Sequence, residues 1–231
     1  TLLTGATGFL GSALARELLK DGRHLKLLAR KNTDTRNIDG LDCEVNYGDL
    51  RDRESLKSAL KGCKTLYHTA AYYSLWSQDK KMIYDINVQG TRNILECALE
   101  AGVEKVVYTS TVGCIGLSGD HSPANEQQPM NPATLCNDYK LSKYEAEQVA
   151  LELFGRGLPL VIVNPSTPVG PRDIKPTPTG KIILDFLHGK MPAYIDTGLN
   201  LIDVADCARG HILAEEKGRL GERYILGNKN M

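Results

Sequence analysis

The sequence predicts an α/β fold built around a doubly wound parallel sheet, and three observations support this prediction. Short apolar runs alternate with amphipathic stretches of helical period along the whole chain, which is the pattern of βαβ units. The apolar runs are continuous rather than strictly alternating, as expected for strands that helices cover on both faces. A glycine-rich turn also joins the first apolar run to the first amphipathic stretch.

The individual strands and helices follow from this alternation. Strands are expected at residues 1–4, 25–29, 44–47, 65–68, 105–109 and 160–163. Helices are expected at residues 10–20, 54–60, 80–101 and 137–155. Parallel strands joined by right-handed helical crossovers form an open sheet, so a Rossmann-type topology is the simplest arrangement.

Composition and charge narrow the class of protein. The 231 residues carry 28 basic and 28 acidic side chains, so no basic field is available to hold nucleic acid. No apolar run reaches the ~18 residues that a membrane span needs. The six cysteines form no C-x-x-C pair and the five histidines form no ligand cluster, so we expect no metal site. Scattered cysteines in a chain of this length favour reduced thiols and a cytoplasmic protein.

The glycine-rich turn has the sequence T-G-A-T-G-F-L-G and predicts a dinucleotide-binding site. Its first glycine permits a sharp turn, the second lets the backbone approach a pyrophosphate, and the third lets the helix pack closely on the strand. The first helical turn then offers free N–H groups and the positive end of its dipole to the phosphates. The residues expected to hold the pyrophosphate are Gly5, Thr7, Gly8, Phe9, Leu10 and Gly11.

The ends of the second and third strands predict which dinucleotide is bound. An acid after the second strand would bind the 2′-hydroxyl of NAD, but this chain has Arg30 and Lys31 there. A guanidinium suits a 2′-phosphate, so we expect NADP(H), with NAD(H) as the alternative if the two cations are merely a solvated pair. Asp49, with Leu50, is placed to meet the adenine amino group. A helix N-cap is the competing role, and Asp52 fits that role better.

Tyr139 and Lys143 form the candidate catalytic pair. They are four residues apart at the start of a predicted helix, so both side chains lie on one helix face. We expect the lysine ammonium to lower the pKa of the phenol, which then exchanges a proton with a carbinol oxygen while hydride passes to or from the adjacent carbon. An ordinary exposed helix pair is the competing interpretation. Ser110 or Thr111, at the end of the fifth strand, can polarise the substrate oxygen, unless these hydroxyls only satisfy loop backbone.

Candidate substrate contacts lie in loops that follow strand ends. Tyr73 and Trp76 follow the fourth strand and can stack on a ring or a sugar, although loop packing is an equal alternative. Arg172 and Lys175 can hold an anionic group, or they are solvated loop charges. They lie in the second of two long loops, residues 116–136 and 164–180, that start at a sheet edge where open α/β sheets bind ligands.

Taken together, the motifs resemble those of the extended short-chain dehydrogenases/reductases, the NAD-dependent epimerase/dehydratase and dihydroflavonol-4-reductase-like group. The matching segments are TGATGFLG, GDL, YHTAA, NVQGT, YTSTVG, YKLSK, NPSTPVGP and IDVADCARG. The stretch that begins NPSTPVGPRDIKPTPTG is most similar to the hopanoid-associated sugar epimerase subgroup.

This resemblance implies roles for particular residues. Thr111, rather than Ser110, is the catalytic hydroxyl, together with Tyr139 and Lys143, which also contact the cofactor. His68 is structural. The further cofactor contacts that the resemblance implies are Asp49, Leu50, Ala70, Ala71, Asn87, Asn164 and Ser166.

The resemblance also implies an organisation. Residues 1–163 are expected to form the NAD(P)-binding Rossmann domain. Residues 164–231 are expected to form part of a small, C-terminally truncated substrate domain, interleaved with the end of the sheet. Pairing of the helices at 80–101 and 137–155 across a dimer axis predicts a homodimer.

The expected function is hydride transfer between NADP(H) and a carbonyl or carbinol of a small-molecule substrate. Val112 and Gly113 follow Thr111 where sugar-nucleotide dehydratases carry Asp-Glu, which disfavours dehydration. Ile115 replaces the tyrosine of many epimerases, which favours a reductase, with an epimerase that retains NAD as the alternative. A non-catalytic dinucleotide sensor is a further alternative, although such a sensor does not need the Tyr139–Lys143 pair.

Overall fold

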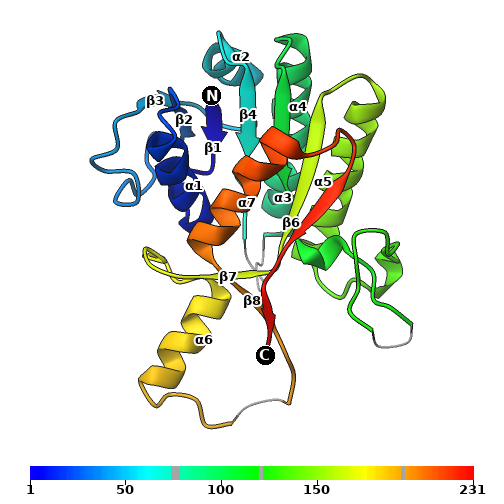
Figure 1. The fold of residues 1–231 in the computed structure, drawn as a ribbon. Coiled ribbons are helices and arrows are strands. Elements are labelled where there is room, and N and C mark those ends of the chain that lie inside the picture. The colour runs from blue at the N-terminus through cyan, green and yellow to red at the C-terminus, as the bar shows by residue number, and fades with distance from the viewer. Residues whose placement is uncertain (74–78, 120–121, 194–195) are drawn as a thin grey trace.

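The computed structural model describes residues 1–73, 79–119, 122–193 and 196–231, and its centre is a seven-stranded sheet (Figure 1). The strands lie in the order β3-β2-β1-β4-β5-β6-β9, and all neighbours are parallel. Their bounds are β1 Leu2–Thr4, β2 Lys26–Ala29, β3 Glu44–Tyr47, β4 Thr65–His68, β5 Lys105–Thr109, β6 Leu160–Pro165 and β9 Arg223–Leu226. The predicted doubly wound α/β sheet is confirmed.

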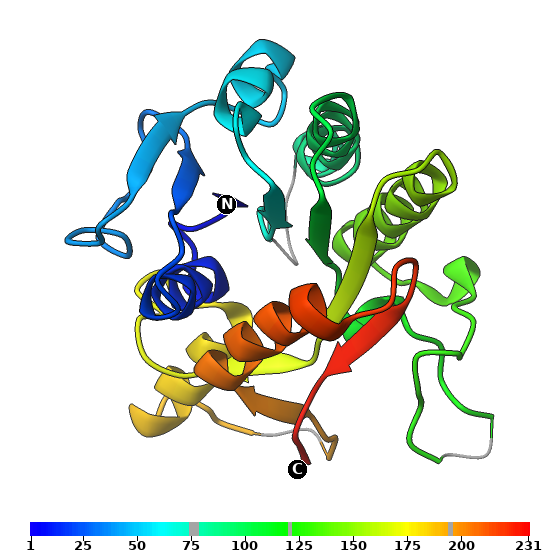
Figure 2. The same ribbon diagram turned by 45° about the horizontal axis from the view of Figure 1, so that its top comes forward.

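Helices cover both faces of this sheet, and neighbouring residues of one strand enter different cores. The helices on one face are α1 Phe9–Lys20 and α7 Val204–Lys217, which lie side by side in both views (Figures 1 and 2). Those on the other face are α2 Arg53–Leu60, α4 Gly90–Glu100 and α5 Asp138–Gly155. Leu3 packs in the core with α1 and α7, whereas Leu2 packs in the core with α2, α4 and α5. The inner strands β1, β4, β5 and β6 are therefore largely apolar, because both of their faces are buried, whereas the edge strand β3 is polar and partly exposed.

The strand order reverses between β1 and β4, and this reversal positions the site. From β1 the chain builds outward to β2 and β3, and then returns to build β4, β5 and β6 on the other side. The helices that leave the two sides diverge, so a crevice opens beyond the carboxyl ends of the strands at this point.

The helix predicted over residues 80–101 is divided into three parts. A short helix α3, Lys80–Tyr84, passes into a π-helical turn, Asp85–Gln89, before α4 begins at Gly90. A π-helical turn widens the helix locally and is common beside functional sites. Asn87 lies in this turn and is buried.

The segment from residue 164 onward contributes to two sheets. Its remaining elements are β7 Thr167–Val169, α6 Pro178–Leu187, β8 Asn200–Asp203 and β10 Lys229–Asn230. These three strands form a separate sheet in the order β10-β8-β7, while β9 joins the edge of the large sheet. Every residue of α6 is at least partly exposed, and Figure 1 shows this helix projecting away from the large sheet.

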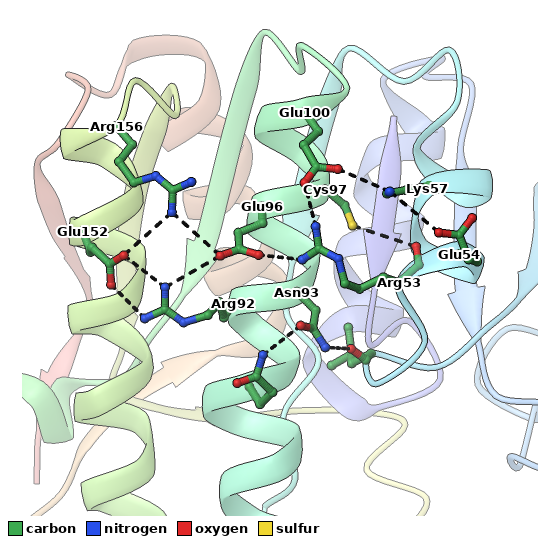
Figure 3. Close-up of polar contacts among 12 residues, drawn as sticks. Arg53, Glu54, Lys57, Arg92, Asn93, Glu96, Cys97, Glu100, Glu152 and Arg156 are labelled. Atoms are coloured by element: carbon green, nitrogen blue, oxygen red, sulfur yellow. Dashed lines mark hydrogen bonds and ion pairs between the residues drawn. The ribbon is translucent and has the colours of Figure 1, made fainter.

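A chain of ion pairs joins α2, α4 and α5 on their outer side (Figure 3). Arg53 of α2 contacts Glu96 of α4 at 2.5 Å, and Arg92 of α4 contacts Glu152 of α5 at 2.7 Å. Arg156, just after α5, lies 3.8 Å from both Glu96 and Glu152. Each half-exposed pair stabilises the fold by only about 0–1 kcal/mol, so the shared apolar core beneath these helices contributes most to their packing.

Candidate active site

A pocket opens at the carboxyl ends of β1, β2 and β4, where the strand order reverses. The predicted cofactor residues that line it are Gly5, Thr7, Gly8, Leu10, Gly11, Arg30, Asp49, Leu50, Ala70 and Ala71. Thr33 and Tyr72 also line it. Phe9, the first residue of α1, is half-buried and does not line this pocket.

The glycine turn forms one wall of the pocket. Gly5 has a φ of +79°, which favours glycine, and a Cβ there would lie 2.6 Å from Thr69 Oγ1. A Cβ on Gly11 would lie 2.2 Å from the carbonyl oxygen of Gly5, so the start of α1 can approach β1 only without a side chain. Gly8 is the N-cap of α1, no side chain among the described residues caps it, and no acid lies in the first turn. These uncapped N–H groups fit a pyrophosphate.

Arg30 and Asp49 lie along the same pocket, beyond the ends of β2 and β3. Arg30 is exposed and lines the pocket, whereas its exposed neighbour Lys31 does not. Asp49 accepts a hydrogen bond from Arg51 Nη2 at 2.8 Å, and this bond lowers the pKa of the carboxyl to about 2. Asp52 caps α2 by accepting from the Glu54 amide at 3.1 Å, so the competing role as a cap belongs to Asp52. Asp49 is not the helix cap, but both of its carboxylate oxygens already accept hydrogen bonds from Arg51.

Asn87 lies behind the pocket wall and ties that wall to α5. Its Oδ1 accepts from the Tyr72 amide at 2.7 Å, and its Nδ2 donates to the Tyr72 carbonyl at 3.2 Å and to Ser142 Oγ at 3.0 Å. Ser142 in turn donates to the Tyr139 carbonyl at 2.8 Å. Asn87 was expected to contact the cofactor, but it does not line the pocket and instead holds Tyr72 and α5 together.

Tyr139 and Lys143 lie in the first turns of α5, which Asn137 caps by accepting from the Lys140 amide at 2.8 Å. The ring of Tyr139 packs against the ring of Tyr73, with centroids 4.6 Å apart and planes tilted by 47°. Tyr73 directly follows Tyr72, which lines the pocket. Tyr139, the candidate proton donor, therefore lies next to the wall of the pocket.

Lys143 is buried and donates to Tyr108 Oη at 3.1 Å and to the carbonyl of Thr109 at 2.8 Å. Burial lowers the pKa of Lys143 to about 8. Burial, and next the neighbouring Tyr73, raises the pKa of Tyr139. The predicted lowering of the Tyr139 pKa is wrong for the protein by itself, because burial dominates and the ammonium is directed to Tyr108.

His68 lies next to Tyr108 and Lys143. Its Nδ1 is 2.7 Å from Thr4 Oγ1, and its Nε2 is 3.0 Å from Thr91 Oγ1. Burial, followed by the charge of Lys143, lowers the pKa of His68 to about 3. The imidazole is neutral at physiological pH, and it links β1, β4 and α4.

The hydroxyls after β5 point to different partners. Thr111 Oγ1 accepts from the Gly113 amide at 3.2 Å, which starts the tight turn Val112–Cys114 and leaves its own hydrogen available. Ser110 is buried and donates to Glu147. Asn164 Nδ2 donates to the carbonyl of Thr111 at 2.9 Å. Of the two hydroxyls, that of Thr111 is the one free to donate to a ligand.

Two buried oxygens at the end of β6 have no hydrogen-bond partner among the described residues. They are Asn164 Oδ1 and Ser166 Oγ. Buried polar atoms are normally paired, so these two could accept hydrogen bonds from a ligand, although neither residue lines the pocket of the glycine turn. The glycine turn and the uncapped start of α1 make that pocket suited to a dinucleotide.

The candidate substrate residues are dispersed. Tyr73 is 46% exposed, with part of its ring left open to solvent. Arg172 and Lys175 are exposed, and Arg172 has a φ of +72°. Arg172 lies close enough to Arg16 of α1 for its charge, after burial, to lower the pKa of Arg16. Trp76 lies outside the described residues.

Several residues of the site carry no motif of their own. Tyr108 occupies the penultimate position of β5, and nothing in the sequence indicates that it accepts from Lys143. Glu147 is buried one helical turn after Lys143, and this spacing of four residues is the signal that could have found it. Thr33 and Tyr72 line the pocket without a distinctive sequence pattern.

Across residues 1–73, 79–119, 122–193 and 196–231, no group of three or more His, Cys, Asp or Glu side chains gathers as metal ligands would. None of the helices in that part of the chain combines the length and apolar character that crossing a bilayer requires. All six cysteines are free thiols.

Three comparisons relate the chain to known proteins. A family model described as the NAD dependent epimerase/dehydratase family matches residues 1–227. A Synechocystis sp. protein provisionally named dihydroflavonol 4-reductase is 50% identical over 99% of this chain and 68% of its own length. The crystal structure of gox2253 has 54% identity and a TM-score of 0.96, covering 100% of this chain and 70% of that one. The Thermus thermophilus UDP-glucose 4-epimerase, solved with NAD, has 28% identity and a TM-score of 0.85, covering 100% of this chain and 78% of its own.

Proposed function

The chain belongs to the NAD-dependent epimerase/dehydratase family, and we propose that it is an NADP(H)-linked reductase of a small ketone or aldehyde, or the reverse dehydrogenase. Membership makes it an enzyme that depends on a nicotinamide dinucleotide. The preference for NADP(H) rests on Arg30, a cation that lines the pocket at its proposed ribose end. At the other end, the pocket residue Tyr72 is followed by Tyr73, whose ring packs on Tyr139. The reductase name of the Synechocystis relative agrees with it.

The pocket residues suit successive parts of NADP(H). The uncapped start of α1 would hold the pyrophosphate, and Asp49 would accept from the adenine amino group. Arg30 would bind the 2′-phosphate through charge-assisted hydrogen bonds. Lys143 has two protein acceptors, so one of its three N–H groups remains for a ribose hydroxyl. The residues proposed to lie nearest the nicotinamide and its ribose are Ala70, Ala71, Asn164 and Ser166.

The catalytic residues would carry the proton while the nicotinamide, when bound, supplies or accepts the hydride. Tyr139 has a raised pKa and is therefore protonated at neutral pH, as an acid that protonates a developing alkoxide must be. Thr111 would donate its free hydroxyl hydrogen to the same substrate oxygen and stabilise the charge that develops there. Lys143 would add a positive charge beneath the site, held by Tyr108 and Thr109.

Tyr73 would form one wall of the substrate site. Its ring rests on Tyr139 and is 46% exposed, so a substrate that reaches the Tyr139 hydroxyl would also meet this ring. Arg172 and Lys175 are proposed to hold an anionic group, since both are exposed. We propose that residues 1–163 form the dinucleotide-binding domain and that residues 164–231 contribute to substrate binding. The second segment also supplies β9 to the large sheet.

An epimerase that retains NAD is the second candidate. It is favoured by the likeness to a UDP-glucose 4-epimerase solved with NAD. Mass spectrometry of the nucleotide released from the purified protein, followed by NADPH and NADH titration, separates the candidates. We expect protein that is free of nucleotide and prefers NADPH. Near-stoichiometric release of NAD⁺ would instead favour the epimerase, because an epimerase keeps its cofactor through turnover.

We also propose a homodimer formed by the helical segments of residues 80–101 and 137–155. Within one chain, α4 and α5 lie side by side and are joined by the Arg92–Glu152 ion pair, so they present one continuous surface (Figure 3). Sedimentation equilibrium at micromolar concentration should give twice the mass of the chain. A mass equal to that of one chain would contradict the dimer.

A further inference from the structure

Glu147 is a buried carboxylate in the site to which the proposed reaction gives no role. It lies on α5, one turn after Lys143 and two turns after Tyr139, and is only 1% exposed. Carboxylates are rarely buried so completely unless they are paired and hydrogen-bonded, so the partners of Glu147 indicate its purpose.

Those partners come from three different strands. Ser110, just after β5, donates its hydroxyl to Glu147. Asn164 of β6 donates to Glu147 Oε2 at 3.1 Å, and the same amide nitrogen donates to the Thr111 carbonyl at 2.9 Å. Arg223 of β9 donates to Glu147 Oε1 at 3.2 Å. One carboxylate therefore links the helix of Tyr139 and Lys143 to the backbone that carries Thr111.

Arg223 extends this link to the loop that follows Thr111. Its Nη1 also lies 3.4 Å from the carbonyl of Cys114, and its Nη2 donates to the carbonyl of Glu126. Glu126 in turn accepts from the Ile225 amide at 2.9 Å. Glu126, in the long loop that the sequence predicts to be functional, is thereby anchored to β9, the strand next to β6.

We propose that Glu147 is a positioning residue that holds Thr111 and Asn164 in register with Tyr139 and Lys143. This inference rests on the proposed function, because it concerns the alignment of the groups that move the proton. Thr111 follows β5 and Asn164 lies in β6, whereas Tyr139 and Lys143 lie on a helix. Glu147 joins both strand segments to the helix, through Ser110 after β5 and Asn164 in β6, so its loss would disturb their alignment.

The charge of Glu147 also acts on Lys143. The titratable and charged groups around Lys143 and Glu147 are Tyr139 from α5, Tyr108 from β5, Cys114 from the turn after Thr111, His68 from β4 and Arg223 from β9. Burial lowers the pKa of Lys143, and the charges of Cys114 and then Glu147 act in the opposite direction. Without the Glu147 charge, Lys143 would lose its proton at a lower pH.

The test compares Glu147→Gln with the wild-type protein. Gln keeps an acceptor for Ser110 but removes the charge and the pairing with Arg223. We expect kcat just below neutral pH to fall by roughly ten- to a hundredfold, as misalignment by about an ångström can cause. The alkaline limb of the pH–rate profile should move to lower pH.

Glu215→Gln is the matched control. Glu215 is a partly buried glutamate, held by Arg23 through two hydrogen bonds of 2.9 and 2.7 Å. It also accepts from Thr65 at the start of β4, so it lies at the amino ends of the strands, away from the site. This control should lose stability without a change in the pH–rate profile. If Glu147→Gln does not fold, Glu147→Gln/Arg223→Gln removes both charges together and should give the same shift in the profile.

Hydrogen–deuterium exchange of residues 110–116 provides a readout that needs no turnover. Exchange in this segment should increase in the Glu147 variant and remain unchanged in the Glu215 variant, even if no carbonyl substrate is reduced and the proposed function fails. The proposal would be overturned if exchange in this segment is unaltered. It would equally be overturned if the two variants lose activity in parallel with an unshifted pH–rate profile, because Glu147 would then only stabilise the fold.

Discussion

The ammonium of Lys143 donates a hydrogen bond to the hydroxyl of Tyr108 at 3.1 Å, and both residues are buried. The same ammonium lies 4.7 Å from the centroid of the Tyr108 ring. Tyr108 is itself stacked on His68, with ring centroids 5.8 Å apart. The charge of Lys143 is therefore held at the carboxyl end of β5 by protein groups alone, and its position does not depend on Tyr139.

The first prediction concerns the pH dependence of cofactor binding. The pKa of Lys143 is lowered by burial to about 8, so the ammonium is charged below that pH and is lost as the pH rises through it. A ribose hydroxyl bound by Lys143 would favour the charged form, so the affinity for NADPH should weaken above about pH 8. Fluorescence titration of NADPH across this range measures the effect. Lys143→Met should bind more weakly with no such dependence, and an equal slope in both proteins would exclude Lys143 as its origin.

The second prediction concerns the choice between NADPH and NADH. Arg30→Asp removes charged hydrogen bonds worth ~1.5–3 kcal/mol and should lower the ratio of NADPH to NADH affinity by roughly ten- to a hundredfold. Lys31→Asp introduces the same charge change at an exposed neighbour that does not line the pocket, and it should leave the ratio nearly unchanged. Equal effects of the two variants on dissociation constants would show a general charge effect instead of binding by Arg30.

The third prediction concerns the glycine turn. A Cβ at position 11 would lie 2.2 Å from the Gly5 carbonyl oxygen, so Gly11→Ala must displace the turn from α1. Overpacking of this kind costs about 1–3 kcal/mol, and thermal unfolding should show it together with a loss of NADPH binding. Gly155→Ala, where a Cβ meets nothing within 4 Å, should bind NADPH normally. Normal binding by Gly11→Ala would mean that the turn does not hold the pyrophosphate.

The fourth prediction concerns Tyr73. Tyr73→Ser removes the ring that packs on Tyr139, and aromatic contacts contribute about 0.5–1.5 kcal/mol beyond their buried area. The substrate KM should therefore rise by roughly two- to tenfold. Tyr73→Phe keeps the ring and should behave like the wild-type protein in steady-state kinetics. A rise in KM for both variants would indicate that the hydroxyl matters and that the ring does not.

Much of the fold was predictable because its strands are buried on both faces. The strand at 105–109 and the helix at 137–155 have long apolar or amphipathic patterns, and both were found within one or two residues. The π-helical turn at Asp85–Gln89 leaves no mark on the apolar periodicity. The small strands β7, β8 and β10 have two to four residues with half-exposed side chains, and this is too short for a pattern.

The site was predictable where it depends on local sequence and hidden where it depends on distant contacts. Gly5 and Arg30 were placed by a turn and by a position after a strand, and both line the pocket. The pairing of Lys143 with Tyr108 joins residues 35 apart through the packing of α5 on β5. Glu147 and Arg223 are 76 residues apart, and nothing local to either one indicates the other.

In the proposed reaction, Tyr139 gives a proton to a carbonyl oxygen while NADPH is consumed. The most direct test follows NADPH oxidation with a panel of ketones and aldehydes, using the wild-type protein and Tyr139→Phe. We predict carbonyl-dependent oxidation that falls by about 10²- to 10⁴-fold in Tyr139→Phe, with the NADPH dissociation constant unchanged. Turnover by Tyr139→Phe at the wild-type rate would contradict the account, because the phenol would then take no part in the reaction.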